Sequence, residues 1–184
     1  MKNHTRRKIA AARRNLNEKS WKERSAAIQE RFLATEWYRS AGTLLSYAHC
    51  GREVRTDTVM RRALGDGKIV CVPLCDWQRN RISAVRITTI EELECRNGIP
   101  EPRTGEPVPT GLLDLVIVPG VAFDETGERT GMGKGFFDRF LVHLRADCEI
   151  VALAFDFQVL KKPLPVEPHD VRMHAIVTET RIIE

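Results

Sequence analysis

Glycine occupies every second position of residues 131–135, which read Gly-Met-Gly-Lys-Gly. Glycine lets a backbone approach a ligand closely, and free N–H groups in such a loop attract an anion. Lys134 adds a full positive charge, and Arg129 lies just before the loop. These residue types favour phosphate binding, although glycines after a strand also form plain turns. The spacing is neither that of the P-loop nor that of the Rossmann fold.

A strand and a helix should position this glycine loop, residues 131–135. The apolar, largely β-branched run 115–118 stops at Pro119 and Gly120, which predicts a strand buried on both faces of a parallel sheet. The apolar spacing of residues 136–144 predicts a helix that begins directly after the loop. Strand, glycine-rich loop and helix together form a layout that is typical of phosphate sites.

The rest of the chain repeats the alternation of strand and helix, which predicts parallel crossovers in an α/β fold. We expect further strands over residues 43–48, 69–74, 150–155 and 175–183, and an edge or antiparallel strand over 82–87. We expect helices over residues 2–18, over 20–37 with a capping box at Ser20 and Glu23, and through 58–64. Residues 97–111 hold four prolines and three glycines, which favours a surface loop over a linker between domains.

Composition limits the class of protein. The chain has 184 residues, of which 42% are hydrophobic, enough for the core of one domain over residues 1–184. No apolar run approaches the ~20 residues of a membrane span, and the basic start lacks the apolar stretch of a secretion signal. We therefore expect a cytoplasmic monomer with no membrane partner. The five cysteines lack C-x-x-C spacing, which argues against a disulfide framework and a zinc site.

The excess positive charge gathers at the N-terminus. Ile9, Ala12 and Leu16 recur at helical spacing, so this segment should be a helix with one apolar stripe and a basic remainder. Lys2 and Arg6 are four residues apart and would share a face. A solvated basic face and a nucleic-acid-binding surface are both compatible with this pattern.

Single polar residues outside the glycine loop give weaker signals. Glu53 comes shortly after a predicted strand, where open α/β sheets gather ligand-binding groups, but it could equally be an acid at a helix start. Asp170 follows Pro168-His169 and alone would be read as a turn residue. His169 and His174 have no matched metal-ligand spacing and are not assigned to a site.

One long stretch resembles the signature of a known family. The sequence Val-Pro-Gly-Val-Ala-Phe-Asp, followed by Gly-Glu-Arg-Thr-Gly-Met-Gly-Lys-Gly-Phe-Phe-Asp-Arg, is similar to that of the 5-formyltetrahydrofolate cyclo-ligases, also called methenyltetrahydrofolate synthetases. Further matches follow in the family's order: Lys2, Arg6, Arg13-Arg14, Glu53-Val54-Arg55-Thr56, residues 98–102 and residues 164–170. The resemblance covers nearly the whole chain.

The resemblance implies a fold and a reaction. The fold would be a three-layer α/β structure with a mainly parallel sheet. The enzyme would convert 5-formyltetrahydrofolate to 5,10-methenyltetrahydrofolate while ATP is hydrolysed to ADP and phosphate, through an iminium phosphate. The Gly98–Pro102 match also implies that the loop over 97–111 frames the site.

The resemblance also implies roles for individual residues. Catalysis would rest on Arg129 and Lys134. ATP would contact Lys2, Arg6, Arg129, Thr130, Gly131, Met132, Gly133, Lys134, Gly135, Phe136 and Phe137. Folate would contact Arg6, Ala48, Glu53, Met132, Gly133, Lys134, Gly135 and Phe136. Magnesium would be held by Asp138 and Asp170. A carboxylate at position 138 would repel a phosphate at the helix start, and a magnesium ion between them would resolve that conflict; a helix cap is the alternative role.

Four positions depart from the family pattern. Phe136 and Phe137 stand where tyrosine is common, so a hydroxyl contact would be missing while the ring could still pack on a ligand. Arg55 and His174 replace acidic residues, and no role transfers to them. The main alternative function is an ATP- or sugar-phosphate-binding protein with another substrate. A non-enzymatic nucleic-acid binder comes third, and we expect no nucleic-acid partner.

Overall fold

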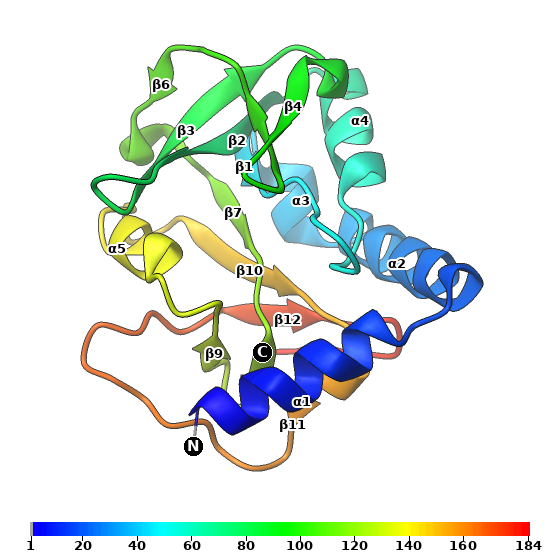
Figure 1. Cartoon of the computed structure of the whole chain (residues 1–184). Helices are drawn as coiled ribbons and strands as arrows, with labels where there is room; N and C mark the ends of the chain where they lie inside the picture. Colours follow the sequence, from blue (N-terminus) through cyan, green and yellow to red (C-terminus); the bar gives the residue numbers. More distant parts are fainter. Residues whose placement is uncertain (1) are drawn as a thin grey trace.

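The computed structural model describes the backbone of residues 2–184 and the side chains from His4 onward. Its centre is an eight-stranded sheet with the order β13-β12-β10-β7-β1-β2-β3-β6 (Figure 1). Strands β12, β10, β7, β1 and β2 run parallel, while β13, β3 and β6 are antiparallel to their neighbours. The bounds are β1 (Thr43–Ser46), β2 (Ile69–Asp76), β3 (Arg81–Ile87), β6 (Pro107–Val108), β7 (Leu115–Val118), β10 (Glu149–Leu153), β12 (Ala175–Val177) and β13 (Ile182–Ile183).

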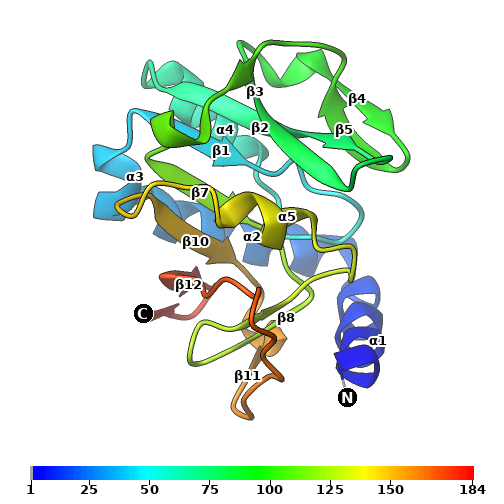
Figure 2. The ribbon, with the colours of Figure 1, turned by 90° about the vertical axis from the view of Figure 1, so that its left-hand side faces the viewer.

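Two layers cover the faces of this sheet. One layer consists of α2 (Glu18–Leu33), α3 (Glu36–Ser40) and α4 (Asp57–Gly65). The other contains α5 (Phe136–Leu141) and a small sheet of β11 (Val159–Leu160), β8 (Ala122–Asp124) and β9 (Arg129–Thr130) (Figures 1 and 2). The predicted three-layer α/β fold with a mainly parallel sheet is confirmed.

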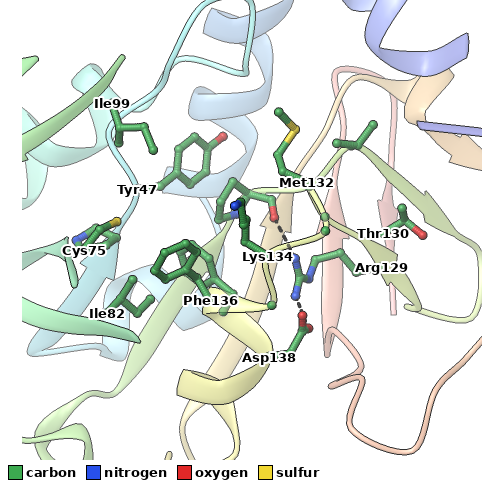
Figure 3. Close-up of a pocket in the computed structure, with 18 of the residues that line it drawn as sticks. Tyr47, Cys75, Ile82, Ile99, Arg129, Thr130, Met132, Lys134, Phe136 and Asp138 are labelled. Atoms are coloured by element: carbon green, nitrogen blue, oxygen red, sulfur yellow. Dashed lines mark hydrogen bonds and ion pairs between the residues drawn. The ribbon is translucent and has the colours of Figure 1, made fainter. Parts of the chain in front are cut away.

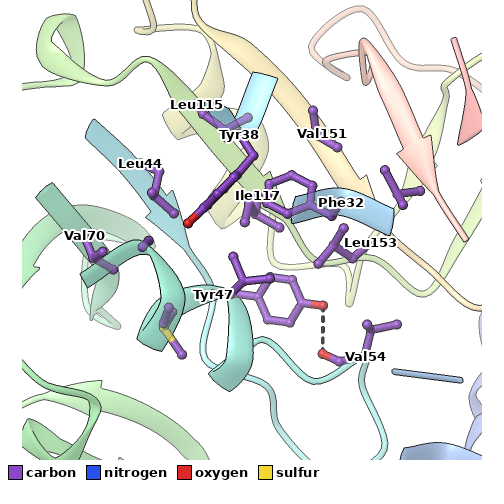
Figure 4. Close-up of a cluster of buried hydrophobic side chains, with 14 of the residues drawn as sticks. Phe32, Tyr38, Leu44, Tyr47, Val54, Val70, Leu115, Ile117, Val151 and Leu153 are labelled. Carbon is purple, nitrogen blue, oxygen red and sulfur yellow. Dashed lines mark hydrogen bonds between the residues drawn. The ribbon is translucent and has the colours of Figure 1, made fainter. Parts of the chain in front are cut away.

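Side chains of the central strands alternate between the two layers. In β7, Leu115 and Ile117 pack toward the helices α2 to α4, and Val116 and Val118 pack toward α5. All four are fully buried, as predicted for a strand covered on both faces. Figure 4 shows the helix-side cluster, in which Phe32 lies among aliphatic side chains of the strands. Each such buried side chain contributes about 1.5–3 kcal/mol to folding.

Helix α1 (Lys2–Arg14) packs apart from these layers. It ends four residues before the predicted boundary at 18, because Asn17 caps the next helix: its Oδ1 accepts from the Ser20 N–H at 2.8 Å. Ile9 is buried against Val121 and Ala122, which follow β7 and begin β8. Ile9 and the half-buried Ala10 therefore dock α1 at the end of a central strand. Ala12, predicted for the same apolar stripe, is exposed, and Leu16 lies beyond the end of the helix.

The predicted helix over 20–37 is two helices. Asn17, and not the capping box proposed at Ser20, begins α2. Thr35 takes an extended conformation and begins α3, where its Oγ1 accepts from the Tyr38 N–H at 3.3 Å. The Thr35 cap thus divides a stretch whose apolar periodicity alone looks continuous, and the Asn17 cap sets where its first helix begins.

Two segments form hairpins where the sequence predicted a loop and a single strand. Residues 97–111 were predicted to lack regular structure, but Ile99–Pro102 (β5) pairs with Leu93–Arg96 (β4). Asn97 and Gly98 join them with φ of 51° and 80°, as a two-residue hairpin turn requires. The predicted strand 175–183 turns back after Val177 to form β12 and β13. Short 3₁₀ turns occur at Ile90–Glu92, Thr110–Leu112 and Asp156–Gln158.

No helix within residues 2–184 combines the length and the apolar character needed to cross a membrane.

Candidate active site

A cavity of about 1080 Å³ opens at the carboxyl ends of the central strands (Figure 3). The chain leaves β1 toward β2 on one side of the sheet and leaves β7 toward β10 on the other. Connections in opposite directions create a crevice between two neighbouring strands, which is where open α/β sheets bind ligands. Tyr47 and Ala48 after β1, and Pro119 and Gly120 after β7, line this cavity. The strand order therefore sets the place of the site.

Arg129 lies buried in the wall of the cavity. Its side chain is only 5% exposed, and Nη2 forms an ion pair with Asp138 while Nη1 donates to the Pro119 carbonyl at 3.4 Å. Burial lowers the pKa of the Arg129 guanidinium, whereas the carboxylates of Asp138 and Asp170 favour its charged form. The structure thus brings together three polar residues predicted for the site, and Asp138 and Asp170 both line the cavity.

Two polar atoms beside the cavity are buried without a partner. Among the residues that the structure describes, Nε of Arg129 and Oγ1 of Thr130 make no hydrogen bond. Buried polar groups are nearly always hydrogen-bonded in folded proteins. Since both residues line the cavity, a polar ligand there could supply the missing partners.

The glycine loop forms one side of the cavity, and all five of its residues line it. Gly133 and Gly135 have φ of 94° and 65°, a backbone region that favours glycine. A Cβ at Gly131 would lie 2.8 Å from Nη1 of Arg129, so a side chain there would displace the guanidinium. Within the described chain, no N–H of residues 131–135 donates a hydrogen bond. The loop therefore presents unpaired donors beside a buried cation.

Two arginines hold the carbonyls of this loop. Arg6 of α1 donates from Nε to the Gly131 carbonyl at 2.9 Å. Arg139 of α5 donates from Nη2 to the Lys134 carbonyl at 2.5 Å and from Nε to the Asn80 carbonyl at 2.9 Å. Helix α5 ends at Leu141, shorter than the predicted span to 144, and its N-cap is Gly135. Asp138 lies in the first turn and pairs with Arg129 instead of capping the helix.

The opposite wall of the cavity is mainly apolar. Phe136 meets the Trp77 ring edge-on at a centroid distance of 5.2 Å, and both line the cavity. Phe137, Ala48 and Met132 also line it, as the resemblance implied. Sequence reasoning missed several other lining residues, namely Tyr47, Cys75, Trp77 and Ile82. The rule that drew attention to Glu53, a position just past a strand's carboxyl end, applies equally to Trp77 after β2.

Glu53 lies on this wall with its carboxyl largely buried. The Cys50 N–H donates to its Oε2 at 3.0 Å, and Nη2 of Arg13 lies 3.8 Å from its Oε1. Burial raises the pKa of Glu53, while the Arg13 charge and the Cys50 N–H favour the carboxylate. Helix α4 begins only at Asp57, so Glu53 is not in the first turn of a helix.

The hairpin of β4 and β5 closes the same wall. Its turn residues Asn97 and Gly98 line the cavity together with Ile99. The Cys50 thiol donates to the Gly98 carbonyl at 2.7 Å and so joins the hairpin to the loop that carries Glu53. The expectation that the Gly98–Pro102 segment frames the site agrees with this position.

Other candidates lie at the margin or beyond it. The side chain of Lys2 lies outside what the structure describes. His169 lines the cavity and sits 3.4 Å from Glu167, whereas His174 contacts Glu149 at 3.0 Å. The five cysteines are free thiols. No group of three or more histidine, cysteine, aspartate or glutamate residues in the described chain could hold a metal ion by itself.

The fold and the cavity define an α/β protein with a switch-point pocket, in which one end suits an anion and the other a flat apolar ring. Residues 1–179 match the profile of the 5-formyltetrahydrofolate cyclo-ligase family. The chain therefore belongs to this family, and the predicted class of enzyme, a ligase, is confirmed.

Individual relatives agree with this assignment. The mouse 5-formyltetrahydrofolate cyclo-ligase is 29% identical over 167 residues, which cover 84% of this chain and 82% of the relative. The Escherichia coli K12 enzyme of the same name is 44% identical over 78 residues, or 42% of each chain. The solved structure of the Aquifex aeolicus 5,10-methenyltetrahydrofolate synthetase has a TM-score of 0.86 and 30% identity, covering 99% of this chain and 91% of that one.

Proposed function

We propose that this protein converts 5-formyltetrahydrofolate to 5,10-methenyltetrahydrofolate, with hydrolysis of ATP to ADP and phosphate. One observation carries the proposal: a single cavity joins the glycine loop and Arg129 to an apolar wall that bears Glu53. Its volume, about 1080 Å³, is slightly above the range of about 300–1,000 Å³ for small-molecule sites. Two substrates could thus lie in contact, as transfer between them requires.

The polar end of the cavity suits the triphosphate of ATP. The unpaired N–H groups of residues 131–135 and the side chain of Lys134 face an anion placed there. The guanidinium of Arg129 is largely removed from water, so its attraction to phosphate is weakly screened. Arg6 lines the same end and, in this proposal, reaches both substrates.

Asp138 and Asp170 would hold magnesium at this end. Both carboxylates line the cavity, and magnesium is commonly held by one or two carboxylates together with phosphate oxygens and water. This donor set is too small to bind the ion alone but fits an ion that arrives with a nucleotide. Bound magnesium would neutralise charge on the phosphate oxygens.

The apolar end of the cavity suits the pterin ring. Ala48 and Phe136 offer flat apolar contact, and the Glu53 carboxyl can accept hydrogen bonds from the ring's N–H groups. Phe136 supplies a ring but no hydroxyl, so recognition here rests on packing. The apolar character also excludes water from the reacting formyl group.

The chemistry needs positioning more than covalent participation by the protein. The formyl oxygen attacks the γ-phosphorus, the bond to the β,γ-bridging oxygen breaks, and ADP leaves. The 10-nitrogen of the folate then attacks the formyl carbon of the iminium phosphate, loses its proton, and phosphate departs. Arg129 and Lys134 stabilise the charge that develops on the transferred phosphoryl group. Since one chain lines the whole cavity, we propose that the enzyme acts as a monomer.

The test is turnover of the purified protein with 5-formyltetrahydrofolate, ATP and magnesium. We expect the absorbance of the methenyl product to appear only with all three present and ADP to form in equal amount. ADP release that does not depend on folate would instead favour an ATP-dependent enzyme with another substrate. Background rates of both products would contradict the proposal.

A further inference from the structure

Helix α1 contacts residues at both ends of the cavity through two arginines. Arg6 and Arg13 are seven residues apart, close to two helical turns, and therefore share a face about 10 Å apart. Arg6 donates to the Gly131 carbonyl at 2.9 Å, whereas Arg13 lies at the Glu53 end. Arg13 also donates from Nη1 to the Gly120 carbonyl at 3.4 Å. One helix thus joins the glycine loop to the loop that carries Glu53.

The contact between Arg13 and Glu53 is shielded from water. Their side chains are only 12% and 19% exposed, so salt screens this pair less than a surface ion pair. The backbone of Glu53 is fixed separately, because Trp21 of α2 donates from Nε1 to its carbonyl at 2.7 Å. Arg13 therefore acts on the carboxyl group rather than on the course of the loop.

Few other charges face this carboxyl. The Tyr47 phenol and the Cys50 thiol lie near it, and burial raises the pKa of both groups, so they stay neutral. Arg52 and Arg55 flank it in sequence but lie over the Trp21 ring, 4.8 Å and 5.6 Å from its centroid. Arg6 lines the same cavity from the other end of α1. Arg13 is the cation that contacts Glu53 among the described residues.

We propose that Arg13 is a positioning residue for the folate: it orients the Glu53 carboxylate at the cavity wall and favours its charged form. Arg13 does not line the cavity, and the resemblance to the family gave it no role. This inference rests on the proposed function, because it assigns Glu53 to the folate end. It predicts that loss of Arg13 affects the two substrates differently.

The expected kinetic effect is selective. Arg13→Gln should raise the KM for 5-formyltetrahydrofolate about 5–30-fold, because the Glu53 carboxylate loses the cation that orients it, and leave the KM for ATP within about twofold. Burial raises the pKa of Glu53 and Arg13 opposes this shift, so the variant should lose folate affinity at a higher pH than the wild type as the pH falls. Arg13→Lys keeps the charge and should recover most of the affinity.

The matched control is Arg14→Gln. Arg14 is the next residue of α1, exposed on another side of the helix, and carries the same charge. It should leave both Michaelis constants within about twofold, since an exposed charge is largely screened. Equal effects of the two substitutions would mean a diffuse electrostatic role and would overturn the proposal.

A double-mutant cycle with Glu53→Gln decides whether Arg13 acts through Glu53. In the Glu53→Gln background, Arg13→Gln should change the folate KM by less than about twofold, because its target is already neutral. Additive effects would show that Arg13 acts elsewhere and would overturn the proposal. Thermal unfolding of each variant identifies any that fail to fold, and the Arg13→Lys and Arg14→Gln variants then carry the test. Absence of methenyl product from the wild type would instead contradict the proposed function.

Discussion

The two loops that frame the cavity are held in different ways. The loop of residues 47–56, which carries Glu53, is closed by its own hydrogen bonds. The Tyr47 hydroxyl donates to the Val54 carbonyl at 3.0 Å (Figure 4). The Thr56 hydroxyl donates to the Tyr47 carbonyl at 2.7 Å. The glycine loop has its carbonyls held from outside by Arg6 and Arg139, while its N–H groups donate to nothing in the described chain.

This difference matches the proposed ligands of the two ends. A loop that is fixed before binding loses little entropy when it recognises a flat, rigid ring. A loop with unpaired donors gains partners only when an anion arrives. We therefore expect changes at the Glu53 loop to alter folate affinity, and changes around the glycine loop to alter turnover and the use of ATP.

The largest effect should come from the cation beside the glycine loop. Arg129→Met should lower turnover at saturating substrate about 10²–10³-fold, because phosphoryl charge then develops without its buried partner. The rate of ADP release and the rate at which the product absorbance appears both measure this loss. Arg145→Met is a matched control, since Arg145 also pairs with an aspartate, Asp114 at 2.5 Å, but does not line the cavity. Near-normal turnover of a folded Arg129→Met protein would refute the role of this end.

Asp138→Asn should have the next largest effect, with turnover lowered about 10–100-fold and the magnesium requirement raised. The ion pair with Arg129 offers a competing role, in which Asp138 only holds the guanidinium. A magnesium titration separates the two, because the competing role lowers turnover at an unchanged magnesium requirement. Asp170→Asn should give a similar but milder shift.

The sequence predicted those elements whose residue types are determined by their immediate surroundings. The strand over 115–118 and the glycine loop were readable because burial on both faces and the need for close backbone approach select their residue types. The hairpin at Asn97 and Gly98 was missed although that dipeptide is a strong local turn signal. The contact of Arg13 with Glu53 had no such signal, because 40 residues of chain separate them and only the docking of α1 brings them together.

Glu53→Gln tests whether the Glu53 loop serves the folate and not ATP. It keeps the shape of the side chain but removes the charge, so the folate KM should rise about tenfold while the ATP KM stays nearly constant. Burial raises the pKa of Glu53, so the wild type should lose folate affinity as the pH falls through that raised value. The glutamine variant should lack this acid-side loss. An ATP-specific defect would count against the assignment.

The smallest effect should come from Arg139, which holds the glycine loop from outside the cavity. Arg139→Ala removes the bonds to the Lys134 and Asn80 carbonyls, which join the glycine loop to the turn between β2 and β3. Each such bond is worth about 1 kcal/mol, and the side chain is exposed, so the ATP KM should rise about 2–5-fold with the folate KM unchanged. Arg61→Ala is the control, because Arg61 is also exposed and, within the described part of the chain, its ion pair is with Glu91, which does not line the cavity. If Arg139→Ala instead raised the folate KM, the two loops would not divide the substrates between them, since the loss of a glycine-loop contact would then be felt at the folate end.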